Sequence, residues 1–209
     1  QCRLSTSVNW NRDCAAMEIA HGSGVAVVGR RNKGAGIFKP DDYIQADALV
    51  TAEKNLFLFL LTGDCLPVIF YDPRKEVVAL AHLSRFNAPT VFLEKIVKTI
   101  SGLGGNAEDT LVGIGPAIHK ESYRFFKEEV EAKLPNWREL GVLIEETPDG
   151  KLAVDPIGYV VEKLVSLGVR GENIEESEID TAKDLNFPSH YSAGNTGEPE
   201  WRMATVAGM

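Results

Sequence analysis

The sequence predicts an α/β protein of the α+β kind, a sandwich in which helices flank a mixed β-sheet. Three observations support this fold class. Short apolar runs crowd the first half of the chain, helical segments interleave with strand-like segments in the second half, and no G-x-G-x-x-G or G-x-x-x-x-G-K-[ST] motif is present. This order favours a mixed sandwich over a regular doubly wound fold, and dinucleotide-binding and P-loop folds lack their signatures.

Strands are expected where short apolar runs lie between turn-forming residues. In the first half these runs are Val25–Val28, Ala46–Ala52, Leu56–Leu61, Pro67–Tyr71 and Val77–His82. Their continuous apolar character indicates a sheet that is covered on both faces. A hairpin turn is expected at Asp72–Lys75, and later strands are expected at Thr110–Ile114, Ile174–Ile179 and Met203–Ala207.

Four segments have helical features: Arg12–Ala20, Pro89–Ser101, Glu121–Leu134 and Pro156–Leu167. In the second of them, apolar residues recur on one face, as in an amphipathic helix. The last has Asp155 as an N-cap, Pro156 at its first helical position and Gly168 after its end. Gly29–Asp42 and Asp184–Glu200 are expected to be loops, and the second is long enough to suggest a functional role.

Length and composition limit the class of protein. With 209 residues, 44% of them hydrophobic, and no visible linker or repeat, the chain is expected to form one domain over residues 1–209. A formal net charge of −8 argues against binding to nucleic acids or anionic membranes, which require a basic surface. The longest apolar stretch, Leu56–Leu61, is too short to span a bilayer.

Cysteine usage indicates a reducing compartment. The three cysteines, Cys2, Cys14 and Cys65, are too few and odd in number for a disulfide framework, so a cytoplasmic location is expected. No charged region followed by an apolar core marks a signal peptide. The first residue is Gln1 rather than Met, which leaves open that an N-terminal segment is missing.

Chemically reactive side chains follow two of the apolar strands. One strand leads into Asp64 and Cys65, and another ends on His82, while His21 precedes a third strand. Taken singly, a buried cysteine and a histidine at a strand end are ordinary structural features. Asp64 would be costly to bury alone, so we expect it to be paired or to face a cleft.

Together, His21, Cys65 and His82 allow two kinds of chemistry. Imidazole and thiolate ligands suit zinc, and three protein ligands with one open position are typical of a catalytic zinc site. The same ligands also serve copper. The second hypothesis needs no metal and makes Cys65 a nucleophile with His82 as its base. The spacing along the chain matches no local zinc motif, so both hypotheses stay open at this point.

Two further residues are candidate substrate contacts. Arg85 lies shortly after His82 and could bind an anion, because a guanidinium offers several donors to an oxyanion. His190 lies in the long loop near the C-terminus and, with its neighbour Tyr191, could line a pocket, although an ordered loop explains both residues equally well.

Six blocks of sequence are distributed over most of the chain from about Ala20 onward. They are Ala20–Val28, Ala46–Thr51, Leu61–Val68, Val78–His82, Gly113–Ile118 and Arg202–Val206. In this order they resemble the laccase-domain family, also known as the YfiH-like or polyphenol oxidase-like purine nucleoside phosphorylase family. The most specific block is Thr62–Pro67, which together with the two histidines carries the resemblance. The N-terminal segment of that family is expected to be partly absent here.

The resemblance implies a fold, a cofactor and an activity. The fold would be an α/β sandwich shared with certain cysteine-hydrolase toxins, and a zinc ion, earlier described as copper, would be held by His21, Cys65 and His82. The implied activity is phosphorolysis of adenosine, inosine and methylthioadenosine, with adenosine deamination as a companion and polyphenol oxidation as an older assignment. A nucleoside and phosphate would be the partners. Cys65 and His82 would be catalytic, and Asp64 would orient the site or act in proton transfer.

The chain departs from the family pattern at three places. The family's Ala-Gly-Trp-Arg-Gly is replaced by Leu83–Asn87, a late Cys-Thr pair by Asp180–Thr181, and a Ser-Tyr-Arg-Arg-like segment by Ser189–Ser192. Because arginines are natural phosphate ligands, these departures concern phosphate more than metal. They keep two alternatives open: a metal-free cysteine hydrolase and a non-catalytic binding protein that retains the fold.

Overall fold

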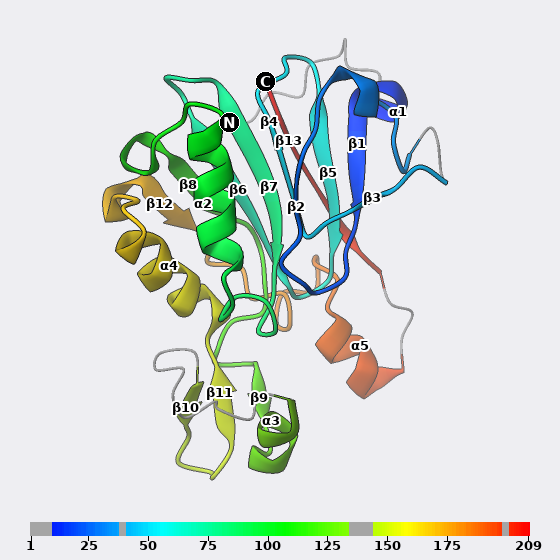
Figure 1. The fold of residues 1–209 in the computed structure, drawn as a ribbon. Helices are drawn as coiled ribbons and strands as arrows, with labels where there is room; N and C mark the ends of the chain where they lie inside the picture. Colours follow the sequence, from blue (N-terminus) through cyan, green and yellow to red (C-terminus); the bar gives the residue numbers. More distant parts are fainter. Residues whose placement is uncertain (1–9, 38–40, 134–143, 198–200) are drawn as a thin grey trace.

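The computed structural model describes residues 10–37, 41–133, 144–197 and 201–209, and its main part has three layers (Figure 1). The middle layer is a six-stranded sheet in the order β12-β8-β6-β7-β4-β2. Its strands are β2 (Val25–Val27), β4 (Ala48–Thr51), β6 (Leu66–Asp72), β7 (Val77–Leu83), β8 (Leu111–Ile114) and β12 (Ile174–Glu176). Helices α2 (Phe92–Gly102) and α4 (Pro156–Ser166) cover one face of this sheet.

A four-stranded sheet covers the opposite face, in the order β13-β5-β1-β3. Its strands are β1 (Cys14–Glu18), β3 (Ile44–Gln45), β5 (Phe57–Thr62) and β13 (Met203–Gly208). The central strand β1 pairs in parallel with β3 and β5, whereas β13 pairs antiparallel with β5. Both sheets of the sandwich are therefore mixed, whereas the sequence predicted a single mixed sheet.

Side chains alternate between two cores along the strands of the middle layer. In β7, Val77, Ala79 and Ala81 pack toward the helices, whereas Val78 and Leu80 pack between the two sheets. Successive residues of a strand point to opposite faces, so a strand between two cores is apolar at every position. The continuous apolar runs have this cause, and the predicted sandwich is confirmed.

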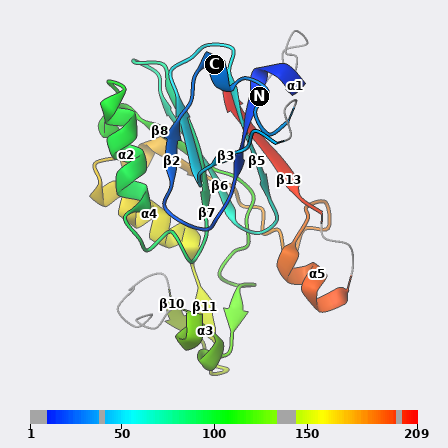
Figure 2. The ribbon, with the colours of Figure 1, turned by 45° about the vertical axis from the view of Figure 1, so that its right-hand side comes forward.

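A small lobe lies at one end of the sandwich, where Figure 2 also shows α5 (His190–Thr196). The lobe contains a three-stranded antiparallel sheet and α3 (Lys127–Lys133). Its strands are β9 (Arg124–Phe125), β10 (Ile144–Glu146) and β11 (Leu152–Val154). Val130, Ile144, Leu152 and Val154 form a separate small core there. Short 3-10 helices elsewhere cover Arg30–Asn32, Ala107–Asp109 and Gly171–Asn173.

The capping signals of α4 are confirmed. The Gly158 N–H donates to Asp155 Oδ1 at 2.9 Å, and Pro156 occupies the first helical position. Gly168 follows the helix with φ of +94°, a conformation that favours glycine because it has no Cβ. No described helix is long and apolar enough to cross a bilayer.

Four predicted segments need correction. The helix expected at Arg12–Ala20 is wrong beyond its first residues, because α1 covers only Trp10–Asp13 and the rest forms the buried strand β1. Pairing with two neighbouring strands outweighs the helix propensity of its alanines and methionine.

The other three corrections concern the lobe, the late loop and one strand. The helix expected at Glu121–Leu134 begins only at Lys127, because Arg124 and Phe125 pair with β11, and Leu134 lies outside the described residues. The loop expected at Asp184–Glu200 contains α5, whose N-cap Ser189 accepts a hydrogen bond from the Ser192 N–H. The strand expected at Ile174–Ile179 ends at Glu176.

Candidate active site

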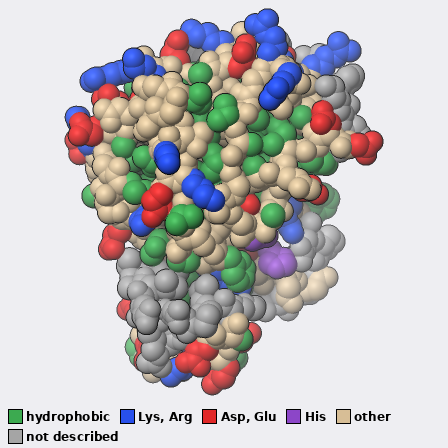
Figure 3. Space-filling model, in the orientation of Figure 1, with side chains coloured by type: hydrophobic (Ala, Val, Ile, Leu, Met, Phe, Trp, Pro, Cys, Tyr) green, Lys and Arg blue, Asp and Glu red, His purple; other side chains and the backbone are tan. Residues whose placement is uncertain are grey.

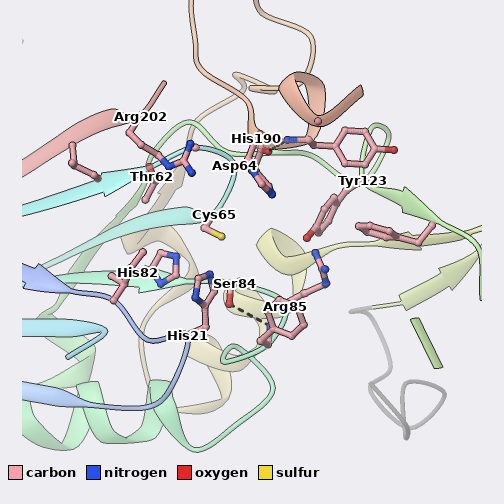
Figure 4. Close-up of a pocket in the computed structure, with 17 residues that line it drawn as sticks. His21, Thr62, Asp64, Cys65, His82, Ser84, Arg85, Tyr123, His190 and Arg202 are labelled. Carbon is pink, nitrogen blue, oxygen red and sulfur yellow. Dashed lines mark hydrogen bonds between the residues drawn. The ribbon is translucent and has the colours of Figure 1, made fainter. Parts of the chain in front are cut away.

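His21, Cys65 and His82 come together at the end of the sandwich that faces the small lobe (Figure 4). One ligand atom from each residue lies within 4.8 Å of the other two. His82 is the last residue but one of strand β7, Cys65 lies between β5 and β6, and His21 precedes β2. The His21 backbone has φ of +54°, a conformation that non-glycine residues adopt rarely and mostly where function or packing requires it.

Strand register explains how His82 is held. Ala48 of β4 lies opposite Ala81 of β7, so Asp47 and His82 follow as the next pair and share one face of the sheet. The His82 N–H donates to the Asp47 carbonyl at 2.8 Å, and His82 Nδ1 lies 3.3 Å from Asp47 Oδ1. Asp47 Oδ2 accepts the Gly22 N–H at 2.9 Å, so one buried carboxylate positions both histidine segments.

Asp47 is a functional candidate that the sequence analysis missed. A histidine that binds a metal usually donates its second ring N–H to a carboxylate, which fixes the ring and its tautomer. Asp47 occupies this position on Nδ1 and leaves Nε2 of His82 for a metal. Its signal in the sequence was an acidic residue directly before a strand that is otherwise buried on both faces.

The charges of this cluster perturb one another. Burial raises the pKa of the Cys65 thiol, but hydrogen bonds and positive charge from His21 and His82 outweigh it and lower the pKa to about 6. Burial lowers the pKa of His82, but Asp47 and Cys65 outweigh it and raise the pKa to about 9. Without a metal, Cys65 and His82 therefore form a thiolate–imidazolium pair at neutral pH.

Asp64 is paired on both carboxylate oxygens. Its Oδ1 accepts the Thr181 hydroxyl at 2.7 Å, and its Oδ2 accepts the Tyr191 N–H at 2.6 Å. The expectation that this buried residue needs partners is therefore met. One hydrogen bond attaches α5, and the other the chain that precedes it, to the residue next to Cys65, an arrangement that favours an orienting role for Asp64.

A cavity of about 470 Å³ opens at the cluster, between the sandwich, the lobe and α5. The space-filling view shows histidine at the surface of this hollow (Figure 3). All six residues singled out in the sequence line it: His21, Asp64, Cys65, His82, Arg85 and His190. Tyr191, which was expected with His190 to line a pocket, also lies there. Tyr123 and Phe125 line the cavity as well, and Phe125 had not been singled out. These aromatic residues come from the lobe and α5, whose positions depend on long-range packing.

Thr62 carries a polar atom without a protein partner. Only 2% of this residue is exposed, and among the described residues no group forms a hydrogen bond with its hydroxyl. Leaving a buried hydroxyl unpaired costs about 1–3 kcal/mol. An unpaired hydroxyl on the cavity wall, next to three soft nitrogen and sulfur donors, fits a site that is completed by a bound group.

Comparison with known proteins identifies the family. Residues 1–209 match the family described as multi-copper polyphenol oxidoreductase laccase. The chain belongs to this family. The resemblance seen in the sequence is thereby confirmed, and the family description together with the His-Cys-His cluster suggests a metal.

Several relatives of this laccase family member carry the names of nucleoside enzymes. A Mycobacterium tuberculosis protein named purine nucleoside phosphorylase is 31% identical over 166 residues, 78% of this chain and 62% of that protein. Purine nucleoside phosphorylase YlmD of Bacillus subtilis is 29% identical over 90% of this chain and 68% of its own. Adenosine deaminase RL5 from an unknown prokaryotic organism is 25% identical over 88% and 71%. The chain thus spans about three fifths of the first of these relatives.

Two solved structures share the fold. Bacillus licheniformis hypothetical protein YfiH superposes with a TM-score of 0.82 at 27% identity, covering 95% of this chain and 74% of that one. YlmD from Geobacillus stearothermophilus gives a TM-score of 0.83 at 25% identity, covering 94% and 73%.

Proposed function

We propose that this protein is a zinc-dependent purine nucleoside phosphorylase that acts on adenosine, inosine and methylthioadenosine. One observation carries the proposal: His21, Cys65 and His82 converge on a cavity that also presents Arg85. The names of the M. tuberculosis and B. subtilis relatives support the same reaction. Cytoplasmic nucleoside and phosphate would be the substrates.

His21, Cys65 and His82 would hold the metal, with zinc as our choice and copper as the alternative, because thiolate and imidazole suit both. A bound zinc supplies a Lewis acid that polarises an oxygen or activates a water molecule. Asp47 fixes the ring of His82 through Nδ1. Asp64 holds the segment with His190 against the cavity, and His190 and Arg85 contact the substrates.

Phosphorolysis exchanges one bond to the sugar for another. The glycosidic bond between C1′ and the purine nitrogen breaks, and its electron pair leaves with the purine. A phosphate oxygen forms the new bond to C1′, and the proton of hydrogen phosphate ends on the purine nitrogen. The chain's task is to hold both reactants in line and to exclude bulk water, which is a large part of catalysis in such transfers.

Two alternative activities can be tested together with phosphorolysis. Adenosine deamination, in which water replaces the amino group and ammonia leaves, is favoured by the relative named adenosine deaminase. A metal-free cysteine hydrolase is favoured by the pKa of about 6 for Cys65 beside the imidazolium of His82.

The test uses zinc-replete protein incubated with adenosine or inosine, with and without phosphate, and separates the products by chromatography. We expect free purine only when phosphate is present, and no turnover by the Cys65→Ala variant. Inosine formed from adenosine without phosphate would indicate deamination instead. No turnover of either nucleoside would overturn the proposal for these substrates, and thiol-dependent hydrolysis without metal would favour the cysteine hydrolase.

A further inference from the structure

Arg85 occupies an unusual position on the cavity wall. Its guanidinium carbon lies 4.4 Å from the ring centre of Phe86, 4.8 Å from that of Phe125 and 5.1 Å from that of Tyr123. The side chain is half-buried, yet no carboxylate among the described residues forms an ion pair with it. Burial lowers the pKa of the Arg85 guanidinium, and the charges of Cys65 and Glu129 only partly offset this effect.

The rings hold the guanidinium by cation–π contact, and no described residue accepts a hydrogen bond from its N–H groups. A stacked arginine still presents its donors edgewise as a planar fork, the geometry that binds two oxygens of one anion. A partly buried cation without a carboxylate gains most from a ligand that brings negative charge. The aromatic contacts restrict the side chain before any ligand binds, so less conformational freedom is lost on binding.

We propose that Arg85 and the ring cage of Phe86, Tyr123 and Phe125 form a subsite for inorganic phosphate beside Cys65. In Figure 4, Arg85 lies on the opposite side of Cys65 from Arg202, next to Tyr123. The inference rests on the proposed function, because phosphate is the second substrate of that reaction. Arg85 touches the anion, whereas the three rings are positioning residues.

The cage joins two parts of the molecule. Phe86 lies in the segment after β7, whereas Tyr123 and Phe125 come from the lobe around β9. Tyr123 and Phe125 also contact each other, with ring centres 4.7 Å apart. The lobe therefore takes part in phosphate binding, because its rings Tyr123 and Phe125 position Arg85, a residue of the sandwich.

The first experiment is calorimetric titration of inorganic phosphate into the zinc-loaded protein. We expect Arg85→Gln to weaken phosphate binding by about 20-fold or more, because it removes the charge and the fork. Arg85→Lys should recover only part of the affinity, since an ammonium keeps the charge but not the planar donors. Zinc content should be equal in all three proteins, which separates anion binding from metal binding.

A matched pair of lobe variants tests the cage. Phe125→Leu should weaken phosphate binding by about fivefold through loss of a ring against Arg85. Phe126→Leu is the control, because the neighbouring ring is 61% exposed and lies 5.1 Å from the Lys151 ammonium instead. It should leave the phosphate affinity unchanged, even though it removes the same number of atoms from the same lobe.

The outcomes separate this inference from the proposed function. Unchanged phosphate affinity in Arg85→Gln, or equal effects of the two phenylalanine variants, would overturn the subsite even if nucleosides are cleaved. Phosphate binding that depends on Arg85, without release of purine, would support the subsite and count against the proposed reaction. Binding of adenosine monophosphate about 100-fold tighter than phosphate, again through Arg85, would show a phosphoryl group carried by the substrate and overturn the assignment to free phosphate.

Discussion

The two described cysteines share a local sequence and differ in chemistry. Each follows an aspartate, in Asp13-Cys14 and in Asp64-Cys65. Cys14 is 1% exposed in β1, where burial and the Asp13 charge raise its thiol pKa to about 11. Cys65 is also largely enclosed, but two imidazoles lower its pKa to about 6.

The contrast shows that residues distant in sequence decide what a cysteine can do. Asp13 forms an ion pair with Lys33 at 3.0 Å, and no histidine takes part in the shifted pKa of Cys14. Asp64 instead uses its carboxylate on Thr181 and Tyr191. The Asp-Cys dipeptide is the same, so the difference lies in what the fold places beside each thiol.

Replacing Cys65 and Cys14 in turn should give the largest difference in zinc content and turnover. Cys65→Ala should lose bound zinc and lower turnover of inosine by about 10³-fold or more, because one of three ligands is removed. Cys14→Ala should keep zinc content and turnover and lose about 1–2 kcal/mol of stability, since it leaves a small cavity in the core. Metal analysis, purine release and thermal unfolding measure these effects. Equal loss of zinc in both variants would contradict the assignment of the ligands.

Thiol alkylation of the metal-free protein should sharpen the comparison. The thiolate is the reactive form, so Cys65 should react at least about 100-fold faster than Cys14 at pH 7.5. The Cys65 rate should rise with pH, reach half its maximum near pH 6 and then level off, whereas Cys14 should stay unreactive up to about pH 10. Peptide-resolved mass spectrometry distinguishes the sites.

The variant His82→Gln is the control for the alkylation experiment. It removes a positive charge and a hydrogen bond from the thiolate, so the midpoint for Cys65 should move upward toward the ordinary range near 8.5. A midpoint that stays near pH 6 would mean that His82 does not stabilise the thiolate.

Most strands of the middle layer could be predicted from sequence, because a strand buried on both faces is an unbroken apolar run. The strand β1 could not be predicted in this way. Its segment, Cys14–Glu18, contains good helix formers, and only its pairing with β3 and β5 makes it a strand. The lobe was missed for a related reason, since β10 and β11 are short and pair only with each other and β9.

In the site, too, some residues could be predicted from the sequence and others could not. His21, Cys65 and His82 could be named from sequence because their residue types suit a metal and stand at strand ends. Asp47 could not, because its role follows from the register that sets it opposite His82. Tyr123 and Phe125 could not either, since nothing near them in the chain indicates that they contact Arg85.

Two buried aspartates, Asp47 and Asp72, allow the same kind of comparison for residues that do not bind the metal themselves. Asp47→Asn should weaken zinc binding by about 10–100-fold, because the amide orients His82 less well than the carboxylate does. Asp72→Asn should leave zinc affinity unchanged, since Asp72 accepts the N–H groups of Arg74, Lys75 and Asn106 far from the site. Competition with a metal indicator measures both.

Asp72→Asn should instead lower the stability of the protein by an amount that depends on pH. Burial raises the pKa of Asp72, but the three backbone hydrogen bonds outweigh it and hold the pKa below its ordinary value. A carboxylate with a lowered folded pKa stabilises the protein above the unfolded value near 3.8, and this stabilisation is lost as the pH falls through the folded pKa. The variant should therefore lose about 1–3 kcal/mol at pH 7 and less as the pH falls. A constant difference down to pH 3 would contradict this origin.

The smallest expected effect concerns two buried threonines. The hydroxyl of Thr110 donates to the Asn106 carbonyl at 2.8 Å, whereas that of Thr62 bonds to none of the described residues. Thr110→Val should therefore lose about 1 kcal/mol of stability and leave purine release unchanged. Thr62→Val should keep or slightly raise the stability of the ligand-free protein, because an unpaired buried hydroxyl is replaced by a methyl group.

If the Thr62 hydroxyl serves a bound substrate, Thr62→Val should also raise the KM for phosphate or nucleoside by a few fold, and Thr62→Ser should restore it. Chemical denaturation gives the stability and steady-state kinetics gives the KM of the unsubstituted protein, Thr62→Val, Thr62→Ser and Thr110→Val. A loss of stability in Thr62→Val equal to that in Thr110→Val would mean that the hydroxyl has an internal partner. Then the cavity wall would be complete at Thr62 without a ligand, and only His21, Cys65 and His82 would indicate a bound group.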